Sequence, residues 1–185
     1  MKQLSAVSKE LLEAIREHYP LNWTGTHGVI HWSRVYDIGA KLSEQQGVNA
    51  RVVQLFSIFH DSQRENEHKD PGHGRRGAQL AEKLRDIIPL NDSEFELLQA
   101  ACCLHTSTIS HGDITVQACF DSDRLDLGRV DIYPDPELLC TPLAKEIETI
   151  QWAYGKSLIH QLPDGAFDLG MCEVLSEFYL GELNP

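Results

Sequence analysis

Residues 52–61 read VVQLFSIFHD, an apolar run that ends in the adjacent pair His60-Asp61. Such a run is typical of a buried helix, and it would carry an imidazole and a carboxylate into the interior of the protein. Burying a neutral polar group without a partner costs roughly 2–7 kcal/mol, and burying a charge costs more. Because a bound cation would give both side chains a partner, the doublet predicts a metal site at the end of this helix.

Further residues of metal-binding types lie at separated positions along the chain. His31 occurs in HGVIHWSRV, His73 in DPGHGRRGA, His105 in ACCLHTS and Asp123 in CFDSDRLDLGRV. We interpret these residues and the doublet as parts of one site.

The length and composition are those of an ordinary globular domain. A chain of 185 residues with 42% hydrophobic and 24% charged residues is long enough to bury a sizeable core. No stretch approaches the ~20 consecutive apolar residues needed to cross a bilayer. The segment MKQLSAVSKELLEAIREHYP also lacks the apolar core of a signal peptide. We therefore expect a single domain over residues 1–185, located in the cytoplasm and without a membrane partner.

Charge and cysteine usage restrict the partners further. The formal net charge of −12 disfavours nonspecific binding to nucleic acid, because the field of the protein repels polyanions. The five cysteines form no CxxC pair, which argues against a disulfide framework and against a thiolate zinc site. We expect them to be small buried residues in a reducing compartment.

Apolar residues recur at three- and four-residue steps along most of the chain, which is the period of one helix face. Together with proline and capping signals, this period predicts helices at about 4–19, 31–42, 49–61, 75–88, 93–105, 114–127, 141–154 and 166–181. Strand patterns are almost absent. The expected fold class is therefore all-α, a helical bundle of about eight helices.

Particular residues are predicted to begin three of these helices. Asn49 can cap the helix that carries the doublet. Ser93 and Glu96 match the S-x-x-E capping box. Thr141-Pro142 is predicted to be a cap followed by proline at the first helical position. The inner face of that last helix would be formed by Leu143, Ile147, Ile150 and Tyr154.

The order of the candidate ligands resembles the HD-domain superfamily of metal-dependent phosphohydrolases, whose pattern is H…HD…D on a helical bundle. His31 matches the first histidine, His60-Asp61 the doublet and Asp123 the closing aspartate. The resemblance covers roughly residues 20–135 and includes the segments FHDSQREN, DPGHGRRGA and DSDRLDLGRV. It implies an HD-type helical domain, completed by the C-terminal helices, in which these four residues hold a metal.

The donor set agrees with this resemblance. Two imidazoles and two carboxylates suit Mn²⁺, Fe²⁺, Co²⁺, Ni²⁺ or Zn²⁺ better than Ca²⁺, which prefers oxygen ligands alone. Some HD-domain groups carry further histidines that bind a second metal, with the aspartate of the doublet as the bridge. His73 and His105 suit this role, but a turn histidine at 73 and a satisfied core histidine at 105 would explain the same positions. The choice between one metal and two stays open at this point.

Arginines near the ligands are candidates for binding a phosphate group, since a guanidinium suits bidentate phosphate recognition. Arg34, Arg64 and Arg124 each lie within four residues of a candidate ligand. Each is equally suited to an ion pair that orients Asp61, Glu65, Asp121 or Asp126. Glu65, four residues after Asp61, is the candidate for orienting the attacking water or a second metal. Asp61 itself is both a ligand and a catalytic candidate.

The expected function is hydrolysis of a phosphomonoester or phosphodiester, a nucleotide or another small molecule, by metal-activated water. Two alternatives remain. One is a di-iron oxygenase of the HD type, which needs His73 and His105 as ligands. The other is a domain that binds a metal or a ligand without catalysis. The pattern specifies neither the substrate nor the oligomeric state.

Overall fold

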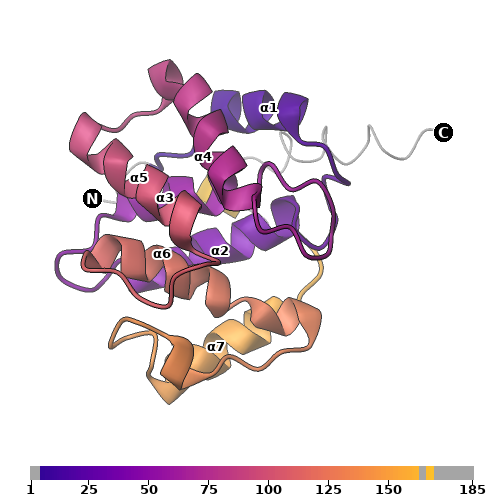
Figure 1. Ribbon diagram of the computed structural model, residues 1–185. Coiled ribbons are helices and arrows are strands. Elements are labelled where there is room, and N and C mark those ends of the chain that lie inside the picture. The colour runs from indigo at the N-terminus through magenta and orange to yellow at the C-terminus, as the bar shows by residue number, and fades with distance from the viewer. Residues whose placement is uncertain (1–4, 163–165, 169–185) are drawn as a thin grey trace.

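The computed structural model describes residues 5–162 and 166–168, and within these residues it contains seven α-helices and no strand (Figure 1). The helices are α1 Lys9–His18, α2 Val29–Leu42, α3 Ala50–Phe59, α4 His73–Lys83, α5 Asp92–Leu104, α6 Ile114–Arg124 and α7 Ile147–Ser157. Short 3-10 turns lie at Arg85–Ile87, Leu127–Val130, Pro136–Leu138 and Ala166–Asp168. The predicted all-α fold class is confirmed.

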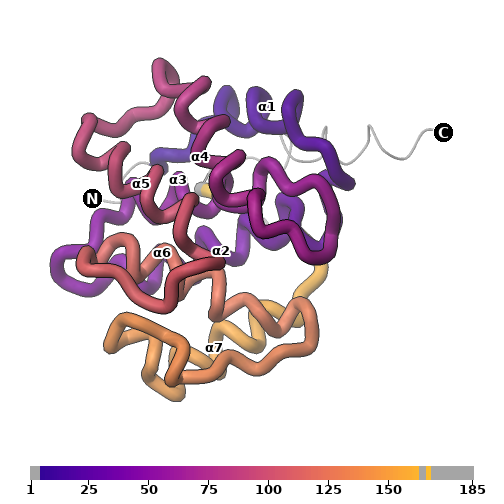
Figure 2. The backbone as a smooth tube through the Cα atoms, viewed as in Figure 1, coloured from indigo at the N-terminus to yellow at the C-terminus, as the bar shows by residue number. Residues whose placement is uncertain are grey.

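Helix α3 lies at the centre of the bundle, where α2, α4, α5 and α6 pack around it (Figure 2). Its sequence explains this position, because seven of its ten residues are buried. A helix that is apolar on all sides is stable only when other elements cover all of them. The doublet that follows α3 is therefore carried into the interior. Helix α7 packs against α2 and the turn Leu127–Val130.

One predicted helix start is confirmed and another is shifted. Asn49 caps α3 as predicted, since its side chain accepts hydrogen bonds from N–H groups of the first turn. The capping box of α5 is formed by Asn91 and Glu94 and not by Ser93 and Glu96, so that prediction was wrong. A long-range contact explains the difference, because the amide of Asn49 donates to Oε1 of Glu94 at 2.9 Å.

Three helices are shorter than their apolar patterns predict. Helix α1 begins at Lys9, directly after the N-cap Ser8, although the apolar pattern starts at residue 4. Helix α4 ends at Lys83 and α6 at Arg124, a few residues before the predicted ends at 88 and 127. In both cases a 3-10 turn follows and continues the three-residue spacing of apolar side chains, which a sequence pattern does not separate from an α-helix.

The helix predicted to start at Thr141 begins only at Ile147, so that prediction was wrong. The buried carboxylate of Asp121 accepts from the N–H of Thr141 at 2.7 Å and from the N–H of Cys140 at 2.8 Å. These bonds hold the segment before α7 in turns. Ile150 is buried as predicted, but Ile147 is 58% exposed and does not belong to the inner face.

The helix predicted at about 166–181 lies outside the described residues, apart from the turn Ala166–Asp168. Among the residues that the structure describes, no helix has the length and apolar character needed to span a membrane. The assignment of residues 1–185 to one domain stays a prediction.

Candidate metal centre

The six predicted ligands come from five helices and meet in the interior of the bundle. His31 lies in the first turn of α2, and His60-Asp61 directly follows α3. His73 is the first residue of α4, His105 caps the C-terminus of α5, and Asp123 lies in the last turn of α6. All of them except Asp123 are buried.

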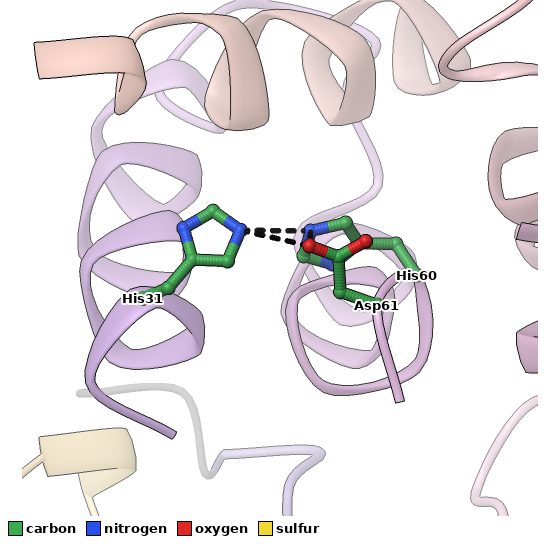
Figure 3. Close-up of side chains that lie close together, drawn as sticks. All are labelled: His31, His60 and Asp61. Atoms are coloured by element: carbon green, nitrogen blue, oxygen red, sulfur yellow. Dashed lines mark hydrogen bonds and ion pairs between the residues drawn. The ribbon is translucent and has the colours of Figure 1, made fainter. Parts of the chain in front are cut away.

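The first ligand group consists of His31, His60, Asp61 and Asp123, and Figure 3 shows the first three. Nε2 of His31 lies 3.0 Å from Nε2 of His60 and 3.6 Å from Oδ2 of Asp61. Oδ1 of Asp123 lies 3.5 Å from Nε2 of His31 and 3.8 Å from Nε2 of His60. Metal–ligand bonds of about 2.0–2.2 Å place neighbouring ligand atoms roughly 3 Å apart. The spacing of the group is therefore close to that of ligands around one ion.

The second ligand group consists of Asp61, His73 and His105. Oδ1 of Asp61 lies 3.1 Å from Nε2 of His73, which in turn lies 2.9 Å from Nε2 of His105. Asp61 thus directs one carboxylate oxygen to each group. Of the two interpretations left open for His73 and His105, the geometry favours ligation of a second ion.

All four imidazoles present the same nitrogen to the centre. Each Nδ1 lies within hydrogen-bond distance of an oxygen atom. Nδ1 of His31 lies 2.7 Å from Oδ2 of Asp126, and Nδ1 of His60 lies 3.1 Å from the carbonyls of Phe56 and Ser57. Nδ1 of His73 lies 2.5 Å from the carbonyl of Asp70, and Nδ1 of His105 lies 2.8 Å from the carbonyl of Cys102. An Nδ1 that donates its proton leaves a lone pair on Nε2. Lone pairs that face each other at 3.0 and 2.9 Å repel unless a cation lies between them.

Asp123 adds a second sign that these residues suit a metal. Its Oδ1 is buried and has no hydrogen-bond partner among the described residues. A buried carboxylate oxygen without a partner is costly, and a cation would remove that cost. The donor set of imidazole nitrogens and carboxylate oxygens matches a divalent transition metal.

Burial and neighbouring charges set the protonation states of the ligands. Burial lowers the pKa of His31 well below its ordinary value, and Arg129 and His60 act in the same direction. Burial, followed by His60, lowers the pKa of His105 to about 4. Burial alone would raise the pKa of Asp61, but the imidazoles of His60 and His31 outweigh it and lower that pKa. At neutral pH the imidazoles of His31 and His105 are therefore neutral and the carboxylate of Asp61 is charged, the forms that bind metals.

The glycines of the segment GHGRRG bring α4 close to its neighbours. A Cβ at Gly74 would overlap the carbonyl of Cys102, and a Cβ at Gly77 would overlap the carbonyl of Phe59. Helix α4 therefore lies with its backbone against the ends of α3 and α5. This close approach brings the first residue of α4 to the doublet.

Arg34 and Arg64 form ion pairs with carboxylates of the centre. Nε of Arg34 donates to Oδ1 of Asp126 at 2.7 Å, and its Nη2 donates to Oδ2 at 3.0 Å. Nη1 of Arg64 donates to Oδ1 of Asp61 at 3.2 Å, while its Nε and Nη2 donate to the carbonyls of Asn66 and His68. Of the two roles left open for these arginines, orienting a carboxylate is the one that the contacts support.

Among the described residues, Arg124 and Glu65 form no hydrogen bond or ion pair with the six predicted ligands. Arg124 donates to the carbonyls of three loop residues, each at 2.7 Å, namely Thr108, Ile109 and Leu138. The side chain of Glu65 is 69% exposed and lies 3.6 Å from Arg76. The prediction for Glu65 assumed a helix that continues past the doublet, whereas α3 ends at Phe59.

Two cavities adjoin the centre, one beside each ligand group. The cavity beside the second group has a volume of about 280 Å³ and a mostly apolar wall that includes His105, Ile109, Leu127, Ile132, Tyr133 and Leu138. Arg124 also belongs to this wall, so its role in substrate binding stays a prediction. The cavity beside the first group has a volume of about 290 Å³ and a more polar wall that includes Thr24, Thr26, His31, Arg34, Arg129 and His160. A small molecule in either cavity would contact a ligand residue.

A solved crystal structure shares this arrangement of helices. It is described as a predicted HD superfamily hydrolase from an uncultured Thermotogales bacterium, with 19% sequence identity and a TM-score of 0.62. The match covers 100% of this chain and 97% of the other. The chain has the HD-type helical fold. No family model matches this chain, and no curated protein does.

Two contacts of this centre were not predicted from the sequence, although Asp126 was considered as the partner of an arginine. Asp126 accepts from His31, as described above, and Nη2 of Arg129 lies 3.6 Å from Oδ1 of Asp123. Both occur in the segment DSDRLDLGRV, three and six positions after Asp123. The three-residue spacing, continued past the last ligand, was the signal that could have found them.

Proposed function

We propose that this protein is a metal-dependent hydrolase of a phosphomonoester or phosphodiester, acting on a nucleotide or another small molecule. The observation that carries the proposal is the position of Asp61, whose Oδ2 faces His31 and His60 while its Oδ1 faces His73. Two metal ions about 3.5–4 Å apart can stabilise both the attacking and the leaving oxygen of a displacement at phosphorus. A carboxylate shared between two ligand groups is suited to hold such a pair.

A divalent ion bound here would act as a Lewis acid and would lower the pKa of a coordinated water. The protein supplies the surroundings in which that chemistry is effective. The Nδ1 contacts fix the orientation of each imidazole, and Arg64 holds the shared carboxylate at 3.2 Å. Because the ligands are buried, few water molecules compete with a substrate oxygen for the centre and electrostatic interactions are strong.

The apolar cavity beside His105 supports a small organic substrate. Exposed apolar side chains gather at its rim, among them Ile109, Ile132, Tyr133 and Leu138. Exposed apolar patches next to polar groups are typical of ligand-binding sites. The cavity could take the organic part of an ester whose phosphate lies at the centre.

The first experiment measures metal content in protein purified without a histidine tag. His60→Ala and Asp61→Ala should lose bound metal and unfold at a lower temperature, because removal of one ligand leaves the others without their counter-ion. His18→Ala, which removes an exposed histidine, is the control. Unchanged metal content in both ligand variants would rule out the proposed centre.

The second experiment screens aryl phosphates, bis-aryl phosphates and nucleotides with Mn²⁺, Co²⁺, Ni²⁺, Zn²⁺ and Fe²⁺. Hydrolysis should stop on chelation and return when one of these ions is added. If no phosphate ester is cleaved with any of them, the hydrolase proposal is wrong.

A di-iron oxygenase is the second candidate, because His73 and His105 converge on Asp61 and that chemistry needs both. Oxidation of a substrate with iron and dioxygen, in the absence of ester hydrolysis, would support it. The non-catalytic alternative is less well supported, since both cavities adjoin ligand residues. Metal binding without turnover in either screen would favour it.

A further inference from the structure

The polar cavity beside His31 has no role in the function proposed above. Its volume is about 290 Å³, and two arginines, two histidines and two threonines contribute to its wall. His31 belongs both to this wall and to the first ligand group. A molecule in the cavity would therefore lie beside the position of the first metal.

Arg129, in the wall of this cavity, leaves most of its donors unused. Its side chain is only 7% exposed. Nη1 donates to the carbonyl of Asp126 at 3.0 Å, but Nη2 lies 3.6 Å from Oδ1 of Asp123, too far for a hydrogen bond. Nε is buried and has no hydrogen-bond partner among the described residues. Unpaired donors on a buried guanidinium are costly, so they indicate an acceptor that binds there.

The three arginines that the sequence suggested for phosphate binding have partners inside the protein. Arg34 donates to a carboxylate and a main-chain carbonyl, Arg64 to a carboxylate and two carbonyls, and Arg124 to three carbonyls. Of the arginines near the ligand groups in the described part of the chain, Arg129 makes the fewest hydrogen bonds, a single one to the carbonyl of Asp126.

The balance of charge in the centre also favours an anion. Before any metal binds, three carboxylates face three guanidinium groups, in the pairs Asp61 with Arg64, Asp123 with Arg129 and Asp126 with Arg34. Each divalent ion therefore adds positive charge without a counter-ion, and an anion in the polar cavity would neutralise it.

We propose that Arg129 binds the phosphoryl group of the substrate in the polar cavity. The two N–H groups of Nη2 donate to non-bridging oxygens, while Nη1 keeps its bond to the carbonyl of Asp126. The paired donors of a guanidinium suit this recognition. The proposal rests on the proposed function, because it assigns the phosphate end of that substrate.

A role limited to positioning a carboxylate does not account for Arg129. Arg34 already holds both oxygens of Asp126 through two hydrogen bonds. Within the part of the chain that the structure describes, Oδ1 of Asp123 has no hydrogen-bond partner, so Arg129 does not satisfy it either.

The test is calorimetric binding of inorganic phosphate to the metal-loaded protein, with metal content measured in every sample. Arg129→Ala should bind phosphate roughly ten- to a hundredfold more weakly with unchanged metal content, since it loses charge-assisted hydrogen bonds. Arg129→Lys should fall between, because it keeps the charge and loses the paired donors. Arg85→Ala, at a surface arginine paired with Asp92, is the control and should bind like the parent.

Two results would overturn the proposal. One is parental phosphate affinity in Arg129→Ala, and the other is loss of metal from that variant, which would mean that Arg129 positions the carboxylate of Asp123. If Arg129→Ala does not fold, the Zn²⁺-loaded parent still decides the question by NMR. The arginine Nε–H resonance that is missing in Arg129→Lys must shift when phosphate is added, and a resonance that stays in place refutes the proposal.

The outcome can be separated from that of the proposed function. Phosphate binding that depends on Arg129, in a protein that cleaves no ester, would refute the hydrolase and keep the anion site. Ester hydrolysis with a KM that Arg129→Ala leaves unchanged would refute the anion site alone.

Discussion

Replacing Asp126 by asparagine should weaken the metal site without removing any ligand. Asp126 is fully buried, and its Oδ2 accepts from Nδ1 of His31 at 2.7 Å while Arg34 donates to both of its oxygens. Burial raises the pKa of Asp126, so its charge depends on the hydrogen bonds from Arg34. Asparagine keeps the shape but removes the charge, and its amide N–H₂ has no acceptor on either neighbour.

Two magnitudes follow from these contacts. Loss of a partner behind a ligand usually costs ten- to a hundredfold in metal affinity, or about 1.4–2.7 kcal/mol. Leaving Arg34 buried without its counter-charge costs about 3–5 kcal/mol of folding free energy. For a chain of this length that corresponds to a fall in Tm of roughly 6–20 °C.

The assay is a competition titration against a coloured chelator, together with thermal unfolding in excess chelator. Asp131→Asn is the matched control, because Asp131 is exposed and its positive φ of 61° is one that asparagine tolerates. If Asp126→Asn keeps the parental metal affinity, the orientation of His31 by this carboxylate does not matter. An unchanged Tm would show that the charge of Asp126 is not required to stabilise the buried guanidinium of Arg34.

Two further predictions concern the second ligand group and pH. Titration with Mn²⁺ should give close to two equivalents per chain in the parent and one in His105→Ala; one equivalent in the parent would mean that His105 is a core histidine. In the metal-free protein, burial lowers the pKa of His105 from 6.5 to about 4, so the unfolded chain binds a proton there that the folded chain does not. The free energy of unfolding should therefore fall as the pH drops from 6.5 to about 4, by up to roughly 3 kcal/mol for this residue. Denaturant unfolding checks this, and a pH dependence just as steep in His105→Ala would contradict the assignment.

Local signals in the sequence predicted a helix start correctly where only one residue could act as the cap. Asn49 is the one capping residue directly before its apolar run, and it caps α3. Near residue 92 two capping boxes are compatible with the sequence. The contact between Asn49 and Glu94 comes from a distant helix, so no local pattern could select the correct box. The helix start predicted at Thr141 was wrong for the same reason, because the N–H of Thr141 bonds to Asp121, which lies 20 residues away in the sequence.

That the six candidate ligands lie together was predictable, because histidine and aspartate in an apolar interior need partners and have few alternatives. Arg124 and Glu65 were assigned by spacing alone, and spacing gives a face only while a helix continues. Glu65 falls beyond the end of α3 at Phe59. Arg124 is the last residue of α6, and its side chain joins two loops. The role of Arg129 depends on which donors remain unpaired, and that is known only from the folded structure.

The contact between His31 and Asp126 joins positions 95 residues apart. A metal bound between His31 and Asp123 would close a loop of nearly the same length, as a disulfide does, whereas the cysteines in the described part of the chain are free. A covalent cross-link around about 100 residues lowers the entropy of the unfolded chain by the equivalent of roughly 4.7 kcal/mol. Part of that stabilisation applies to a cross-link through a metal ion for as long as the ion stays bound. Removing the metal should therefore loosen every helix between α2 and α6 together, and amide hydrogen exchange should rise across all of them and not at the site alone.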